Sequence, residues 1–523
     1  MPKSKNKKIL PFIILILIMA LAVFFRTYHI NTAPPGIYPD EAVNAQDAIN
    51  ANASGHYQWF YAANNGREGL EMNLTALAFK LFGISIFSLK LTDMIAGTLT
   101  VLGMYLLTNE LFDKKRMALI AAFLTAVSFW AVNFSRMAFR ANLLPTVLVF
   151  SFYFLFRGIR TRKFLDFAIS GFIFGIGVHT YIAFRIAPAI MVALLLSFVL
   201  SHKNFLKEYW KHIIVFIFLT FISAAPMLYT FYAHPEYFSS RTSEISVFNS
   251  AVNHGHLVTT ILKTFGLSLL KYNFIGDQNW RQNFPPYPIL DPLTGLAFLL
   301  GIIYVAMELV RLSALRLAHK IKDVRLDAYV LLIVWFFVML VPEFLADEGN
   351  PHALRSIGTL PAVMILAAMG FELFLERSEK SSRFFKKIMA TILIAMMLSI
   401  GIFNYVKYFV VWANKDAAGY AFDKNLTDIA RKIQSMPRQE EKFVVTSYNT
   451  LENEPIRIFT LNDDVNFYLP NQTDQIAPRD PKSFAIFLTG NYQDAAVALK
   501  QRFPQLSLQE VNNSLGSVYY ILK

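Results

Sequence analysis

Long apolar runs recur along the chain and are separated by polar segments. Each run is close to the roughly 20 residues that an α-helix needs to cross the hydrocarbon core of a bilayer. The pattern therefore predicts a polytopic α-helical membrane protein with about eleven transmembrane helices. We place these spans near residues 9–25, 88–108, 117–134, 143–157, 164–182, 186–200, 213–231, 292–310, 328–345, 356–375 and 388–411.

The first apolar run, Ile9 to Phe25, follows the lysine-rich start MPKSKNKK, an order that is typical of a secretory signal. The residues that come next, Phe25-Arg26-Thr27-Tyr28-His29, do not form a small-residue cleavage site. We therefore interpret this run as an uncleaved first transmembrane span.

Lysine and arginine are unevenly distributed among the polar segments. Short segments rich in both alternate with longer segments that carry fewer basic residues. The rich segments lie at 3–8, 114–116, 157–163, 203–211, 311–325 and 377–387. Because short cytoplasmic loops concentrate Lys and Arg, we expect a multi-pass protein of the plasma membrane with a cytoplasmic N-terminus. An odd number of spans then places the C-terminal segment outside the cell.

Two outer loops, at about 26–87 and 232–291, are long. In the first, the apolar spacing from Leu70 to Phe82 predicts a helix that lies in the membrane interface. In the second, four prolines between Gly276 and Pro292 exclude a regular helix or a central strand and predict a shaped loop. Long polar loops above a membrane bundle usually carry function.

Composition changes at about residue 412. We predict a transmembrane module at 1–411 and a small extracytoplasmic α/β domain at 412–523, with a polar helix over 414–435. Short buried strands are expected at 443–446 and 484–488, with further candidates at 456–461 and 518–522. This domain is expected to cover the active site or guide the acceptor, or simply to stabilise the protein.

Overall composition excludes several classes of protein. A hydrophobic content of 55%, a charged content of 16% and a mean hydropathy of +0.41 exclude a soluble protein. The formal charge of +13 is spread over the loops and forms no patch for nucleic acid. The absence of cysteine excludes disulfides, thiol catalysis and cysteine-ligated metal sites.

Two adjacent carboxylates, Asp40 and Glu41, follow the first span closely. The prolines and glycine before Asp40 prevent helix, whereas Glu41 to Asn50 contains no helix breaker, so Asp40 is expected near a helix N-terminus. The helix dipole favours the ionised state there, which a catalytic base requires. The alternative is that Asp40 is only an N-cap. Neighbouring residues of a helix point about a third of a turn apart, so one carboxylate would act and the other support it.

Other outer-loop groups are candidates for binding an anionic substrate, because the planar guanidinium fork of arginine suits phosphate. Each group also has an interpretation without a role in binding. Arg67 and Glu68 could form a surface ion pair, and the groups at the outer ends of the spans could extend to the lipid headgroups. His254 and His256 have too few partners to indicate a metal site. The candidates for substrate binding are Arg67, Glu68, Arg136, Arg140, His179, Tyr181, Arg185, Asp277, Arg281, His352 and Arg355.

Several motifs resemble those of the GT-C glycosyltransferases, in particular the bacterial branch related to protein O-mannosyltransferases and the lipid A aminoarabinose transferase. The resemblance covers about residues 1–410, and the C-terminal domain carries little of it. The motifs are YPDEAVNAQDA after the first span, NNGREGL before LFGIS, SFWAVNFSRMAFRANLLP, VHTYIAFRIAP and HALRSIGTLPA.

The resemblance implies sugar transfer from a polyprenyl-phosphate donor to a lipid, glycan or protein acceptor at the outer membrane face, with inversion at the anomeric carbon. Asp40 would be the base that activates the acceptor hydroxyl. Glu41, Arg67 and Glu68 would bind the acceptor or a metal. Relatives often carry an aspartate in the second outer loop where this chain has Asn142, so dependence on a divalent metal is left open.

Two rival functions use the same outer-loop arginines. A transporter or flippase of lipid-linked glycans usually has ionisable residues near the bilayer midplane, whereas here they cluster at the outer ends of the spans. A ligase or polymerase of lipid-linked glycans would need no aspartate in the first loop. The position of Asp40 favours the glycosyltransferase.

Overall fold

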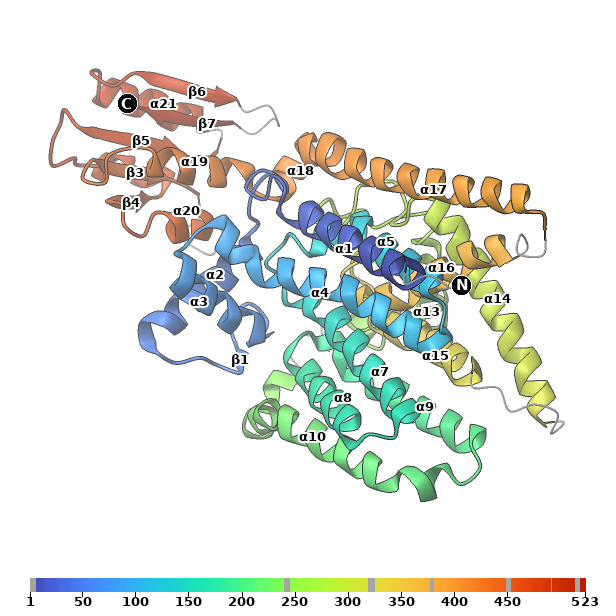
Figure 1. Cartoon of the computed structure of the whole chain (residues 1–523). Coiled ribbons are helices and arrows are strands. Elements are labelled where there is room, and N and C mark those ends of the chain that lie inside the picture. Colours follow the sequence, from blue (N-terminus) through green and yellow to red (C-terminus); the bar gives the residue numbers. More distant parts are fainter. Residues whose placement is uncertain are drawn as a thin grey trace.

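The computed structural model describes residues 6–238, 245–317, 325–376, 381–447, 453–490, 492–512 and 518–523. It consists of a bundle of long helices and a small C-terminal domain built on a β-sheet (Figure 1). The helices of the first outer loop lie between these two parts (Figure 1). The predicted fold class, a helical membrane bundle with a small C-terminal α/β domain, is confirmed.

Nine helical segments in the described part of the chain are long and apolar enough to cross a membrane. Their main helices are α1 (Asn6–Thr27), α4 (Ile86–Phe112), α7 (Leu143–Thr161), α9 (Pro188–Ser201), α10 (Phe205–Ala233), α14 (Pro292–Leu317), α15 (Arg325–Phe344), α16 (Leu360–Glu376) and α17 (Arg383–Tyr405). Short turns extend several of them, namely η1 (Arg140–Asn142), η3 (Ile182–Ile186), η4 (Ile357–Thr359), the π-helical η5 (Val406–Val411) and η6 (Trp412–Asn414).

The two other predicted spans form shorter helices. The run at 117–134 is divided at Ser128 into α5 (Lys115–Val127) and α6 (Phe129–Phe134). The run at 164–182 forms α8 (Phe164–Ile176) and η2 (Gly177–His179). Because neither is as long as a typical span, the predicted number of eleven is not established.

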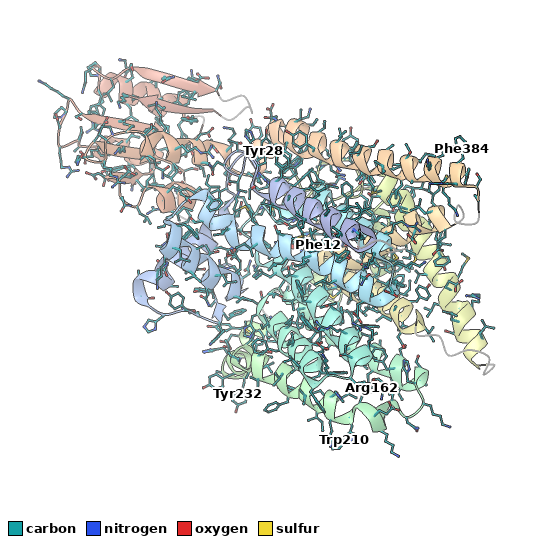
Figure 2. The ribbon with its side chains drawn as sticks, in the orientation of Figure 1. Phe12, Tyr28, Arg162, Trp210, Tyr232 and Phe384 are labelled. Atoms are coloured by element: carbon teal, nitrogen blue, oxygen red, sulfur yellow. The ribbon has the colours of Figure 1, made fainter. Side chains whose placement is uncertain are left out.

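Large apolar side chains cover the outside of the bundle. Phe12 of α1, Trp210 and Tyr232 of α10, and Phe384 of α17 are more than half exposed and point away from the neighbouring helices (Figure 2). A soluble protein rarely exposes so much contiguous apolar surface. These helix faces are therefore suited to lipid, as the apolar runs of the sequence predict.

The first outer loop contains two helices and a short hairpin. Helix α2 (Pro39–Ser54) precedes strands β1 (Phe60–Tyr61) and β2 (Arg67–Glu68), which pair antiparallel, and α3 (Leu70–Phe82) has the bounds predicted from its apolar spacing. The second loop carries α12 (Ser250–Asn253) and α13 (Leu257–Leu270). Its proline-rich part has no regular helix or strand, as predicted.

The C-terminal domain has a five-stranded sheet in the order β4-β3-β5-β7-β6. Its strands are β3 (Glu441–Val445), β4 (Val465–Tyr468), β5 (Phe484–Leu488), β6 (Leu508–Asn512) and β7 (Val518–Leu522). The three strands β4, β3 and β5 are parallel, and β7 pairs antiparallel with β5 and with β6. The helical segments are α18 (Asp416–Ala421), α19 (Lys424–Gln434), α20 (Glu454–Phe459), η8 (Pro470–Gln475) and α21 (Gln493–Arg502).

Side chains of the central strands alternate between two apolar cores. Phe443, Ile486 and Leu488 pack with α21, whereas Val444 and Phe487 pack on the other face with α19 and α20. The strand expected at 456–461 is wrong, because this segment forms α20. Pro455 occupies its first turn, and Ile456 and Ile458 are buried while Arg457 between them is only partly buried.

Candidate active site

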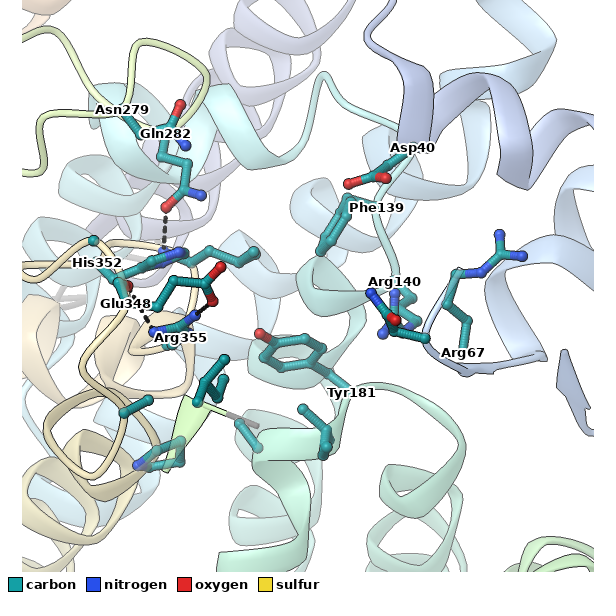
Figure 3. A pocket seen from close by; sticks show the side chains of 18 of the residues that line it. Asp40, Arg67, Phe139, Arg140, Tyr181, Asn279, Gln282, Glu348, His352 and Arg355 are labelled. Carbon is teal, nitrogen blue, oxygen red and sulfur yellow. Dashed lines mark hydrogen bonds and ion pairs between the residues drawn. The ribbon is translucent and has the colours of Figure 1, made fainter. Parts of the chain in front are cut away.

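A cavity of about 710 Å³ opens where the two outer loops meet the ends of the helices (Figure 3). All the predicted site residues except Glu41, Arg136 and His179 line it. They are Asp40, Arg67, Glu68, Arg140, Tyr181, Arg185, Asp277, Arg281, His352 and Arg355. Asp40, Arg67 and Arg140 lie on one side, and His352 and Arg355 lie opposite (Figure 3).

Asp40 lies in the first turn of α2 and faces the cavity. The N-cap residue is Tyr38 and Pro39 is the first helical residue, so the alternative that Asp40 is merely the N-cap is wrong. Its Oδ1 accepts a hydrogen bond from Asn64 Nδ2 at 2.8 Å. Asn64 lies in the hairpin turn with φ of 50°, a conformation in which asparagine is enriched. The helix dipole and one amide hydrogen bond therefore hold the carboxylate in place.

Glu41 points in a different direction and is completely buried. Its Oε1 accepts the backbone N–H of Ala138 at 2.9 Å, and the Nζ atom of Lys90 lies 3.7 Å from the same oxygen. Burial raises the pKa of Glu41, whereas Lys90 and the backbone N–H groups lower it. Glu41 thus anchors α2 to α4 and to the segment before η1, and it does not line the cavity.

Arg67 connects the hairpin to α2. Its Nη1 donates to Asn44 Oδ1 at 2.6 Å and its Nη2 pairs with Asp47 Oδ2 at 2.5 Å. The side chain is only 2% exposed, so the alternative of a surface ion pair is wrong for this residue. Burial raises the pKa of Asp47, and the charge of Arg67 opposes that rise.

Glu68 lies between two arginines. Arg140 Nε donates to Glu68 Oε2 at 2.7 Å, and Arg185 Nη2 lies 3.7 Å from Oε1. The guanidinium of Arg140 also lies over the rings of Phe139 and Tyr181, at 5.5 and 5.6 Å from their centroids. This group forms a cationic and aromatic wall on the Asp40 side of the cavity.

Arg281 and Arg355 contribute further positive charge. The guanidinium of Arg281 lies 5.1 Å from the centroid of the Tyr38 ring, two residues before Asp40. Among the residues that the structure describes, Arg281 has no carboxylate in ion-pair contact, and its Nε donates to Asn279 Oδ1 at 3.4 Å. Arg355, in contrast, pairs with Glu348. Arg281 is therefore the cation of this cavity best placed to accept an anionic ligand.

Three successive backbone N–H groups of the segment that carries His352 and Arg355 are held by side chains. The N–H of His352 donates to Glu343 at 2.9 Å, that of Ala353 to Asp277 at 2.7 Å, and that of Leu354 to Gln282 at 3.2 Å. Asp277 and Gln282 belong to the proline-rich loop. Their hydrogen bonds tie this loop to the segment that carries His352 and Arg355.

Burial raises the pKa of Asp277 to about 7, although two backbone N–H groups oppose the rise. In the unfolded chain this pKa returns to about 3.8. Between these values the folded protein holds a proton that the unfolded chain has lost, so the free energy of unfolding decreases as pH rises from about 4 to about 7, by at most about 1.4 kcal/mol per pH unit.

We expect Asp277→Asn, which cannot titrate, to lose this part of the pH dependence. The measurement is thermal unfolding in detergent at pH 5 and pH 7 for both proteins. Burial also raises the pKa of Glu71 to about 7. Glu71→Gln is therefore the matched control, and it should remove a separate part of the pH dependence of unfolding. Equal slopes for wild type and Asp277→Asn would contradict the titration of Asp277.

Arg136 and His179 do not line the cavity. The three nitrogens of the Arg136 guanidinium all donate to backbone carbonyls, including Phe25 at 2.8 Å and Ala33 at 3.0 Å, and so hold the chain after α1. His179 is 4% exposed, and its Nε2 lies 2.9 Å from the carbonyl oxygen of Ser223 in α10. Both residues support the surrounding structure.

A metal ion would find few ligands at this site. No three His, Asp or Glu side chains come together to hold one anywhere in the described ranges. Asn142, at the position considered for an acidic ligand, is buried and donates to the carbonyl oxygen of Asp93 at 2.9 Å. The residues present do not fit a divalent metal, and the chemistry proposed below uses none.

Sequence reasoning missed several residues that shape the site. Asn64 and Tyr38 lie close to Asp40. Both belong to motifs of the sequence, but only other residues of those motifs were candidates for the site. From the sequence alone, Lys90 was not expected to lie buried beside Glu41. The signal for Lys90 was a lysine among apolar residues near a span end, which is rarely tolerated without a partner.

Parts of the sequence match a known protein family and a known protein. The family model of the dolichyl-phosphate-mannose-protein mannosyltransferases matches residues 72–229, which is less than a third of the chain. The proposed mannosyltransferase YkcB of Bacillus subtilis (strain 168) is 27% identical over 205 residues. That alignment covers 37% of this chain and 27% of YkcB.

Solved structures match almost the whole chain. ArnT from Cupriavidus metallidurans, bound to undecaprenyl phosphate, has a TM-score of 0.52 at 12% identity, over 99% of this chain and 98% of ArnT. The oligosaccharyltransferase AglB from Archaeoglobus fulgidus, with an inhibitory peptide and a dolichol-phosphate, has a TM-score of 0.53 at 14% identity, over 99% and 74% of the two chains. The chain therefore shares its fold with these two proteins over almost its whole length, and the fold expected from the motif resemblance is confirmed.

Proposed function

We propose that this protein is an inverting glycosyltransferase that moves a sugar from a polyprenyl-phosphate donor to a lipid, glycan or protein acceptor. The observation that carries the proposal is the position of Asp40, whose carboxylate lines the same cavity as several arginines. A base for the acceptor and a binding site for phosphate are both required by this reaction. The structural relatives bound to undecaprenyl phosphate or dolichol-phosphate support a lipid-linked donor.

The chemical step follows from this arrangement. Asp40 takes the proton of the acceptor hydroxyl while the hydroxyl oxygen forms a bond to the anomeric carbon. The bond from that carbon to the phosphate oxygen breaks on the opposite face, so the configuration inverts and the polyprenyl phosphate leaves with the electron pair. Arg281 stabilises the charge that develops on the phosphate, because a cation aimed at developing charge lowers the barrier in a water-poor site.

Topology is part of the proposal. The distribution of basic loops supports an orientation with the cavity and the C-terminal domain on the outer side of the plasma membrane and the N-terminus in the cytoplasm. Both long outer loops line the cavity, so donor and acceptor would meet at the outer face.

The test is transfer of radiolabelled sugar from a panel of polyprenyl-phosphate sugars to membrane extracts. We expect purified wild-type protein to transfer label from at least one donor. Transfer from none, with labelled lipid crossing vesicle membranes instead, would favour a flippase. Transfer of a preassembled glycan alone would favour a ligase.

We expect Arg281→Gln to lower kcat/KM for the active donor by about 10- to 100-fold, because hydrogen bonds to charged groups contribute about 1.5–3 kcal/mol. Arg311→Gln, which changes an exposed arginine paired with Glu308 on α14, is the matched control and should leave transfer unchanged. Wild-type kinetics for Arg281→Gln would exclude it from the phosphate site.

A further inference from the structure

The three residues that lead into Asp40 rest on the C-terminal domain. The backbone N–H of Ile37 donates to Thr427 Oγ1 in α19 at 3.1 Å. The ring of Tyr38 packs edge-on against that of Phe422, with centroids 5.9 Å apart. These contacts join positions almost 400 residues apart in the sequence. Figure 1 shows α20 beside α2.

Gly36 allows this close approach. A Cβ atom at this position would lie 2.2 Å from the carbonyl oxygen of Phe422 and 3.0 Å from the Cα atom of Lys424. Both are backbone atoms and cannot move as a flexible side chain could. The chain before Asp40 therefore lies in direct backbone contact with the turn between α18 and α19.

The rear of α2 is also in contact with the domain. Ala42, Ala45 and Ala48 form one buried apolar cluster with Ile458 of α20. Their small side chains let α20 approach α2 closely. Arg431 of α19 donates to the carbonyl oxygen of Asn31, earlier in the same loop. The first turn of α2 is thus bounded on one side by the membrane module, through Glu41, and on the other by the C-terminal domain.

We propose that the C-terminal domain sets the position of Asp40, with Thr427 as the positioning residue that fixes the backbone at Ile37. This inference rests on the proposed function, because it assigns the domain a part in the reaction of that site. Thr427 is buried, and the N–H of Ile37 is held in a buried segment. Without Thr427 Oγ1 this N–H loses its acceptor, and the start of α2 must shift or find water.

The effect would appear in the rate of the chemical step. A misplacement of about 1 Å can cost about 100-fold in rate, whereas Arg281, the proposed phosphate-binding residue, is carried by the proline-rich loop. We therefore expect Thr427→Val, which has nearly the same shape, to lower kcat by about tenfold with KM for the donor unchanged. Thr427→Ser keeps the hydroxyl and should restore most of the rate.

The matched control is Thr446→Val. Thr446 is also buried in the C-terminal domain, and its hydroxyl donates to Asn453 Oδ1 at 2.8 Å, within that domain. A fall in kcat for Thr427→Val but not for Thr446→Val, at similar thermal stability, supports the inference. Equal kcat for wild type and Thr427→Val overturns it, as does an equal loss in both variants.

A second measurement separates the contact from the reaction. Hydrogen exchange of the amide of Ile37 should be faster in Thr427→Val than in wild type, and unchanged exchange would contradict the contact. If wild type transfers no sugar, the proposed function fails and the assignment of Thr427 falls with it. If wild type transfers sugar and only the Thr427 prediction fails, the fault lies in this inference alone.

Should Thr427→Val not fold, Arg431→Gln replaces it. We expect a smaller fall in kcat for Arg431→Gln, and an unchanged kcat would count against the inference.

Discussion

Asp40→Asn should lower the rate of sugar transfer by about 10²–10⁴-fold, the range that a positioned general base contributes in other enzymes. The change keeps the size of the side chain and removes its capacity to take a proton. Asn64 can still contact the amide, because Asn64 carries both a donor and an acceptor. We therefore expect the loss in kcat with little change in thermal stability. The measurement is the transfer assay with the donor that serves wild type.

A matched control exists in the same protein. Asp494 is the second residue of α21, as Asp40 is of α2, and it lies exposed in the C-terminal domain. Asp494→Asn therefore reproduces the loss of a carboxylate from the first turn of a helix without touching the cavity. Full activity in Asp494→Asn with loss in Asp40→Asn supports the base. Equal activity in both would exclude Asp40 as the base.

Much of the fold could be predicted from the sequence, because apolar runs of about 20 residues rarely form anything other than membrane-spanning helices. The limits of that approach are visible at 117–134, where the run is continuous but the helix breaks at Ser128, with φ of −54° and ψ of 128°. At 456–461 a short apolar run fits a strand or a helix equally well. Whether this segment forms a strand or a helix depends on its packing against the sheet and against α2, which lies far away in the sequence.

In the candidate site, too, the directions of neighbouring side chains could be predicted from the sequence, whereas features that depend on distant parts of the chain could not. Local helix geometry predicted that Asp40 and Glu41 point apart, and in the structure one faces the cavity while the other faces Lys90. Arg136 and Arg140 were both candidates for substrate binding, and in a continuous helix residues four apart would share a face. The chain leaves the helix between Phe134 and Arg140, so the two arginines diverge. Only Arg140 reaches the cavity.

Breaking the buried pair of Glu41 and Lys90 should strongly destabilise the protein. Both side chains are 0% exposed, with 3.7 Å between Lys90 Nζ and Glu41 Oε1. Glu41→Gln leaves the lysine charge buried without its counter-ion, a situation that costs about 3–5 kcal/mol. We expect a clear fall in the thermal unfolding temperature in detergent. Asp40→Asn, one residue away, should show no comparable fall.

The double variant Glu41→Gln/Lys90→Met tests whether the charge itself is the cause. Removing the lysine charge should recover much of the stability, because a buried ion pair replaced by uncharged side chains of similar size is often neutral for stability. Glu308→Gln on α14 is the control, since its partner Arg311 is 56% exposed and a pair of this kind should contribute only about 0–1 kcal/mol. If Glu41→Gln is as stable as this control, the buried pair does not hold α2 against α4. If the double variant is no more stable than Glu41→Gln, the loss comes from the backbone N–H groups of Ala138 and Tyr38, which two carboxylate oxygens accept but a single amide oxygen cannot, and not from the unpaired lysine.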